Sequence, residues 1–428
     1  MLKTKHLALS LFLGFFVTQS FAQGLGNSPY SPIGLGDISN GTSVANDMMG
    51  GTGVSFGGRI GANLQNPAML VKNSFVGFNI GLSGQNKTIN TSSASQKVFG
   101  MGLQYLSFVF PTNKKWTMGI NLQPYSRVDY KATLSKSVVG ENSKVLYNFE
   151  SVGGVTKVGL GNGFQIGKSL YAGFELGYLL GSIQRDTTSQ LILGTSQNYY
   201  IRYGNRLSFS KGGVLKAGLA YQQKLSKKWQ LNVGGTYEIS SSLKAEQLRS
   251  VGTLIDNGTG PSKIKATDTL GVYTGSVRLP SRYRVGISLE SPYKLTVAAE
   301  YSVQDWSTFK NMSNSTSSYL GMSKTMNFGV EYIPNATSTK YFNQVFYRVG
   351  FQNQQTPYIV NGMMIKDQSI TFGMSVPMAY RSANYIDLGF ALGRRGTTSN
   401  NLVLENYFKI NVGFSLIDAR WFLKPKID

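Results

Sequence analysis

Short stretches of the chain alternate apolar residues with small or polar ones at a period of two, from Phe75 to Leu416. In residues 230–239, for example, Leu231, Val233 and Tyr237 fall on one face of an extended strand and polar residues on the other. Short turns and long polar connections alternate between these stretches. An outer-membrane barrel sorts its connections in this way because its turns face two different compartments. The pattern predicts an all-β protein, an antiparallel transmembrane β-barrel of about 14 strands with an N-terminal hatch that plugs the lumen.

The expected strands share this alternation and a length suited to a membrane barrel. They are centred on residues 75–83, 101–110, 116–126, 151–160, 170–180, 214–223, 229–240, 283–290, 295–304, 325–333, 345–352, 369–376, 385–393 and 406–416. The longest connections, residues 181–213 and 241–282, are expected to be polar loops.

Charged and glycine positions fall on the face opposite the apolar residues, as at Glu175, Arg284 and Glu300. Lipid cannot solvate these charges, so they are expected to point into the lumen and to be paired. A soluble sandwich would bury the same apolar residues, but it would not explain why charges and glycines share a face.

The chain divides into four expected segments. Residues 1–22 have the positive start, apolar core and small-residue cleavage site of a secretory signal peptide. Their apolar run is too short for a membrane-spanning anchor helix. Residues 23–74 do not alternate and are too few for a core of their own, so they are expected to pack inside the barrel as the hatch. Residues 75–416 form the barrel, and residues 417–428 form a periplasmic extension.

The composition excludes several kinds of catalytic and metal site. The chain has no Cys, and its one His is His6, inside the expected signal peptide. Ser-His-Asp and Cys-His catalysis and nearly all zinc chemistry are therefore excluded from the exported protein. The segment Gly50-Gly51-Thr52-Gly53 lacks the Lys-Ser/Thr that completes a phosphate-binding loop. No enzyme, cofactor or metal site is expected.

The net charge is +22. Its cations are scattered through loops and turns and form no single basic stripe, which favours contact with anionic lipid or lipopolysaccharide over nucleic-acid binding.

Several motifs resemble the FadL/TodX family of outer-membrane transporters for hydrophobic compounds. The segments 48–54 (MMGGTGV) and 63–70 (NLQNPAML) are similar to the hatch signature of that family, and residues 279–286 and 347–351 to its central and late hairpins. The opening NSPYSP at residues 27–32 and the closing RWFLK at residues 420–424 are similar to a branch common in Bacteroidota.

The resemblance implies passive uptake of small hydrophobic molecules, such as long-chain fatty acids, in the bacterial outer membrane. Loops would capture the ligand, a pocket near the hatch would hold it, and a lateral opening in the wall would release it. The residues expected to contact ligand from the hatch and lumen are Met48, Met49, Val54, Phe56, Lys216, Arg284 and Arg348. The expected hatch motif is Gly50, Gly51, Gly53, Asn66, Pro67 and Ala68, and the lateral opening is expected where Pro124, Gly153 and Gly154 break strand pairing.

Two further functions remain open. The chain could be a non-transporting barrel that serves as a subunit or scaffold of an outer-membrane secretion or assembly complex, with basic loops as docking surfaces. It could also be an open porin, against which a lumen-filling hatch argues.

Overall fold

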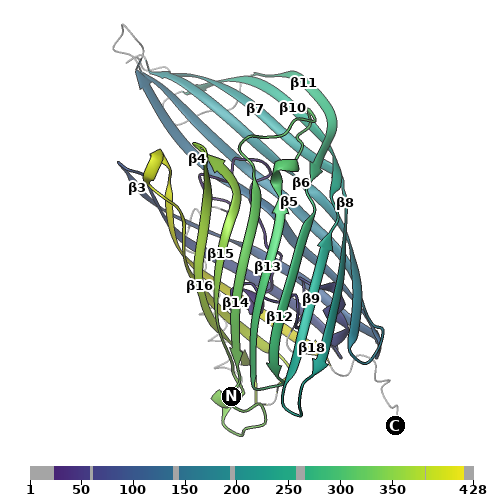
Figure 1. Cartoon of the computed structure of the whole chain (residues 1–428). Helices are drawn as coiled ribbons and strands as arrows, with labels where there is room; N and C mark the ends of the chain where they lie inside the picture. Colours follow the sequence, from purple (N-terminus) through teal and green to yellow (C-terminus); the bar gives the residue numbers. More distant parts are fainter. Residues whose placement is uncertain are drawn as a thin grey trace, which may run out of the picture.

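A computed structural model describes residues 24–57, 61–137, 144–192, 198–256, 266–380 and 382–418. The expected signal peptide and residues 419–428 of the expected extension lie outside these ranges. The described chain forms one antiparallel sheet of 18 strands that closes on itself, because β18 pairs with β2 (Figure 1).

Fourteen of these strands form the wall, as predicted, each hydrogen-bonded to the next. They are β2 (Val76–Asn90), β3 (Ser95–Asn113), β4 (Trp116–Ser137), β5 (Lys144–Gln165), β6 (Leu170–Ile192), β8 (Gly213–Lys224), β9 (Gln230–Glu238), β12 (Arg282–Ser291), β13 (Leu295–Asp305), β14 (Met322–Tyr332), β15 (Phe346–Val360), β16 (Met363–Pro377), β17 (Tyr385–Gly396) and β18 (Leu404–Asp418).

Their alternation places apolar side chains on the outside. Phe174, Leu176, Tyr178 and Leu180 of β6 are all exposed, whereas Glu175 between them is buried. A sheet that closes on itself and carries an apolar outer surface of this kind is that of a barrel spanning the bacterial outer membrane. Among the described residues, none belongs to a helix with the length and apolar character needed to cross a membrane.

The remaining four strands lie off the wall. The strand β1 (Asp37–Ile38) belongs to the N-terminal segment and pairs with β4. The strands β7 (Asn198–Lys211), β10 (Ser241–Asp256) and β11 (Ala266–Leu279) extend one side of the barrel upward in Figure 1. The prediction of polar loops at residues 181–213 and 241–282 is therefore wrong. The far end of β6 pairs with β7, β7 pairs with β10, and β10 pairs with β11.

The helical elements are short. The N-terminal segment holds α2 (Val44–Asp47) and the 3₁₀ helix η1 (Pro67–Lys72), and the connections hold η2 (Trp306–Thr308), η3 (Tyr341–Gln344) and η4 (Ser399–Asn401). Helix α2 packs against β16, β17 and β18, whereas η1 packs against β4, β5, β6 and β8. The hatch thus touches opposite sides of the wall and fills the lumen between them.

Candidate functional site

The glycines of the hatch motif allow it to lie directly on the wall. Gly50 has a φ of +67°, and a Cβ on it would lie 2.6 Å from the carbonyl oxygen of Phe351. Met49 packs on Gly329 of β14, where the wall also lacks a side chain. Glycines on both surfaces are needed because the two backbones approach so closely.

The Asn-Pro-Ala motif holds the other end of the hatch. The Asn66 side chain accepts from Ala68 N at 3.0 Å and donates to the carbonyl oxygens of Val54 at 2.7 Å and Leu219 at 3.1 Å. Pro67 and Ala68 begin η1 and lie against Gly173 of β6. The expected hatch residues therefore fix the hatch to the wall.

The predicted lumen cations already have partners. Lys216 Nζ donates to the carbonyl oxygen of Leu64 at 2.9 Å and lies 3.3 Å from Glu175 Oε2. Arg284 donates to the carbonyl oxygen of Asn40 at 2.6 Å. Both side chains thus hold hatch backbone.

A third predicted cation serves the wall. Arg348 bonds to Glu331 at 2.8 Å, and it also donates to Ser375. Glu300, which was expected to be paired, accepts from the hatch amides of Gly53 at 2.9 Å and Val54 at 3.1 Å.

The sequence reading missed a second buried charge cluster. Arg395 bonds to Asp37 of the hatch at 2.9 Å and to Asp367 at 3.0 Å, and Lys87 lies 3.3 Å from Glu405. Lys87, Asp367 and Glu405 are buried charges inside strands, where the period of two assigns them to the lumen. That alternation was the available signal.

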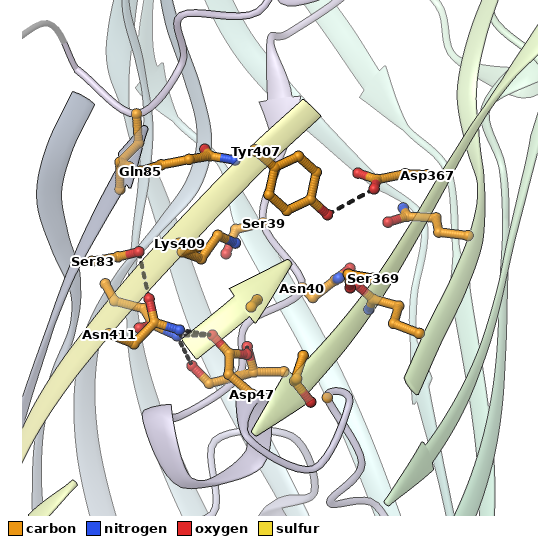
Figure 2. A pocket seen from close by; sticks show the side chains of 18 of the residues that line it. Ser39, Asn40, Asp47, Ser83, Gln85, Asp367, Ser369, Tyr407, Lys409 and Asn411 are labelled. Atoms are coloured by element: carbon orange, nitrogen blue, oxygen red, sulfur yellow. Dashed lines mark hydrogen bonds between the residues drawn. The ribbon is translucent and has the colours of Figure 1, made fainter. Parts of the chain in front are cut away.

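A cavity with a volume of about 170 Å³ lies between this cluster and the hatch (Figure 2). Its lining includes Met48 but is otherwise mainly charged, amide and hydroxyl side chains. Figure 2 shows Asn411 between Ser83 and Asp47, and Tyr407 donating to Asp367 at 2.8 Å. Burial raises the pKa of Asp47, which accepts from Thr42, Gln104 and Asn411.

The remaining residues of the expected pocket are not gathered around this cavity. Met49 and Phe56 line a separate space of about 50 Å³ beside Arg348. Lys216 and Arg284 line another of about 30 Å³. Val54 is fully buried in hatch packing. That these residues bind a ligand stays a prediction.

Apolar side chains gather at the outer end of the lumen, where they pack on one another. The cluster joins Tyr30 and Leu35 of the hatch to Ile183 of β6, Leu243 of β10 and Trp306 of η2, all at most 3% exposed. Tyr30 also stacks on Tyr358 of β15 with ring centroids 6.4 Å apart. We call this cluster the outer plug; it packs across the lumen on the side of the long hairpins.

The wall is divided between β3 and β4. These strands pair from Asn113 and Trp116 only as far as Leu106 and Leu122. Beyond this point β3 continues to pair with β2, and β4 with β5. We call the unpaired stretch the β3–β4 seam.

Both ends of hatch residues 24–39, which we call the N-terminal strap, lie along the seam. In the strap, β1 pairs with Ser126 and Arg127 of β4, and Asp129 N donates to Gly26 O at 2.9 Å. Arg127 crosses the seam and donates to the carbonyl oxygen of Leu103 on β3.

The seam bears on the predicted lateral opening. Pro124 lies beside the last β3–β4 pair, at a register shift between β4 and β5. The prediction that Gly153 and Gly154 break pairing is wrong, because both pair with β4 and β6. Their φ values of +119° and +152° form an irregularity that the two ladders accommodate.

No cluster of three or more potential metal-ligating residues occurs in the ranges that the structure describes. The chemistry of the site is that of buried ion pairs and hydrogen bonds that hold a plug in a barrel.

Solved structures with the same fold are outer-membrane channels. The chain is similar to the Pseudomonas putida toluene transporter TodX (TM-score 0.56, 17% identity, 88% of this chain and 98% of that one) and to a Pseudomonas aeruginosa FadL homologue (TM-score 0.57, 12% identity, 89% and 98%). It is also similar to the monoaromatic hydrocarbon channel CymD (TM-score 0.53, 15% identity, 88% and 98%). At these identities the likeness establishes the fold, and it confirms the FadL/TodX resemblance at that level.

Among curated protein sequences, none matches the chain significantly. The sequence profile named BamG matches residues 1–428, the whole length. The chain therefore belongs to the BamG family and has the barrel fold of the FadL/TodX channels.

Proposed function

We propose that this protein is a closed, non-transporting barrel that serves as a scaffold subunit of an outer-membrane secretion or assembly complex. The observation that carries the proposal is the content of the lumen. Apolar side chains in the outer plug pack on one another, and the cavity between the hatch and the Arg395 cluster is lined mainly by polar groups.

A transporter of hydrophobic compounds needs an apolar void. Small-molecule sites usually measure about 300–1,000 Å³ and are lined mostly by apolar side chains. The cavity of about 170 Å³ is smaller, and Lys87, Asp367, Arg395 and Glu405 line it. An apolar ligand there would displace solvent from charged groups without replacing their hydrogen bonds.

The anchoring of the hatch also favours a static plug. Three wall side chains bond to hatch backbone: Glu300, Lys216 and Arg284. The hatch side chain of Asn66 bonds to wall backbone, and Asp37 of the hatch is paired with Arg395. Moving the hatch would break several buried charge-assisted bonds at once, each worth about 1.5–3 kcal/mol.

One observation favours a second function, the passive uptake of small hydrophobic molecules such as long-chain fatty acids. The β3–β4 seam lies where a ligand could leave the wall sideways, as predicted near Pro124. For that route the strap must leave β4, and Arg127 must release Leu103. Capture by the long hairpins and a hatch-gated pocket would complete this mechanism.

Two measurements decide between these functions. The full-length protein, extracted from its native membranes in mild detergent, should carry a stoichiometric protein partner. Cells that express it should take up labelled toluene and oleate no faster than cells without it. Saturable uptake that is lost when the strap is tied to β4 by a disulfide between introduced cysteines, with no partner present, would reverse the assignment.

A further inference from the structure

Strands β10 and β11 stand outside the membrane. Below them β9 pairs directly with β12, up to Glu238 and Arg282. The nine residues of β9, tilted as in a membrane barrel, span about 20 Å of an apolar band that is about 25 Å tall. Because β10 begins at Ser241 and β11 ends at Leu279, the hairpin that they form starts at the outer boundary of that band; Figure 1 shows it above β9 and β12.

Strand β11 is the last strand of the outer sheet. It pairs with β10 from Leu279 to Ala266, and β10 pairs in turn with β7. On its other side, Arg278 forms a single bridge with Lys310, and Met312 lies beside Gly275. In the part of the chain that the structure describes, no strand pairs with that side between Asp268 and Thr274. We call this stretch the β11 edge.

The side chains of the β11 edge do not protect it. Leu270 and Val272 are 54% and 55% exposed, above the band where lipid would cover them, and a register shift leaves Leu270 without an opposite residue on β10. The guanidinium of Arg249 lies over the Tyr273 ring, with its Cζ 5.0 Å from the centroid of that ring. The edge, with sequence DTLGVYT, contains no Lys and no Pro.

A second free edge in the same sheet is protected. Residues 130–137 of β4 pair with β5 on one side only in the described chain. That stretch carries Lys131 and Lys136, and lysines on an edge discourage pairing with another chain. The two edges thus differ in their lysines, which discourage strand addition at the β4 edge and are absent from the β11 edge.

The groups left unpaired at the β11 edge identify its occupant. Backbone N–H and C=O groups in an extended row are matched by another extended polypeptide, which binds by strand addition. At the end of the edge near the membrane, Lys244, Arg278 and Lys310 outnumber the acidic Glu246. These cations favour acidic side chains on the partner.

We propose that the β11 edge binds an extended segment of a partner protein, with acidic residues at its membrane-proximal end, as an added strand along Asp268–Thr274. This inference rests on the proposed scaffold function and names the surface that would serve it. The apolar side chains of Leu270 and Val272 would pack against side chains of the added strand.

Two kinds of experiment test this surface in the full-length protein in its native membrane. A photoreactive benzophenone amino acid at Val272 should cross-link to one polypeptide, and the linked peptide should be an extended segment that contains Asp or Glu. The same group at Leu134, on the protected β4 edge, should give at least tenfold less product. The Leu270→Glu/Val272→Glu variant should lose at least 90% of the partner on purification, whereas Leu134→Glu should retain it.

The outcomes separate the surface from the function. Full partner recovery with the double variant would overturn the β11 edge as the site and leave the scaffold function standing. A Val272 cross-link only to lipopolysaccharide, only to a second copy of this chain, or to nothing would also overturn it. Absence of any stoichiometric partner in the wild type would reject the scaffold function. Unchanged heat resistance of the double variant excludes misfolding as the cause of partner loss.

Discussion

Individual charged side chains of this barrel hold the hatch in place. Sequence alternation correctly placed Glu175, Arg284 and Glu300 inside, because a charge facing lipid is too costly. It could not identify the hatch groups that the lumen charges bind, since Lys216 bonds to Leu64 and Arg284 to Asn40 only after the hatch has folded back into the lumen. A period of two assigns a face to each side chain, whereas ion pairing depends on contacts between distant segments.

Glu175 is the buried carboxylate between two ammonium groups, Lys157 at 2.6 Å and Lys216 at 3.3 Å. Glu175→Gln leaves both cations without their counter-charge and should lower the free energy of unfolding by about 3–5 kcal/mol. Glu150→Gln removes an exposed pair with Lys131 and should cost less than about 1 kcal/mol. Denaturant titration in detergent micelles measures both. Equal effects would mean that the buried triad contributes no more than a surface pair.

Lys72 should make hatch stability depend on pH. Burial lowers the pKa of Lys72 to about 8, and its ammonium donates to Tyr171 Oη at 2.7 Å. The unfolded chain holds this proton up to about pH 10.5, so between pH 8 and 10.5 the unfolded state binds more protons and raising the pH stabilises the fold. The midpoint temperature of the wild type should therefore rise relative to that of Lys72→Met between pH 7 and 10. A constant or opposite difference would contradict the lowered pKa.

The strands illustrate how far sequence periodicity extends. The strand number and the outward faces were predictable because lipid imposes an apolar surface on one face. Strand lengths were underestimated outside that band, where β4 continues from the expected end at Ser126 to Ser137. Strands β7, β10 and β11 were missed for the same reason. Both faces of these strands are partly solvated, so residues 198–211 and 241–279 do not alternate cleanly.

The β3–β4 seam was visible only in part. Pro124 marks its start because proline lacks the N–H that a ladder needs. Nothing local in residues 95–105 shows that they pair on one side only, since pairing is a long-range property. The prediction at Gly153 and Gly154 was wrong because a glycine pair is compatible both with interrupted strand pairing and with a bulge inside a paired ladder.

Closure of the seam depends on close backbone contact with the strap. Gly36 has a φ of +101°, and a Cβ on it would lie 2.5 Å from the carbonyl oxygen of Arg127. Gly36→Val should therefore weaken the strap by more than about 1.4 kcal/mol, which is about tenfold in its opening equilibrium. Because the chain has no Cys, a single cysteine at Gly102, where a Cβ would lie 3.7 Å from Leu25 of the strap, reports that opening by its rate of maleimide labelling. Gly167→Ala, at a turn with open space, is the matched control and should leave the rate unchanged.

An unchanged labelling rate in Gly36→Val would show that the strap does not cover the seam. A rate raised equally by Gly167→Ala would point instead to general loosening of the barrel.

At the scale of the whole molecule, the described residues fill the lumen in two layers. The outer plug joins hatch residues to β6, β10 and η2, and below it charged side chains bind hatch backbone. These two layers differ in chemistry, so a disturbance of one should leave the other in place. A channel would need both layers to open on the same path, which is why we propose a scaffold function for the barrel.

The hatch should control conductance through the barrel. In planar bilayers the intact protein should show almost no steady conductance, whereas deletion of residues 24–73 should open an aqueous lumen, because a wall of fourteen strands is too wide for its own side chains to fill. If the deletion prevents folding, Glu300→Ala combined with Arg284→Ala removes the acceptor of Gly53 and Val54 and the donor to Asn40. Such a variant should show brief conducting events, whereas Glu150→Ala should show almost no conductance. Steady conductance of the intact protein, unchanged by either alteration, would mean that solvent passes around the hatch and that the plug does not seal the barrel.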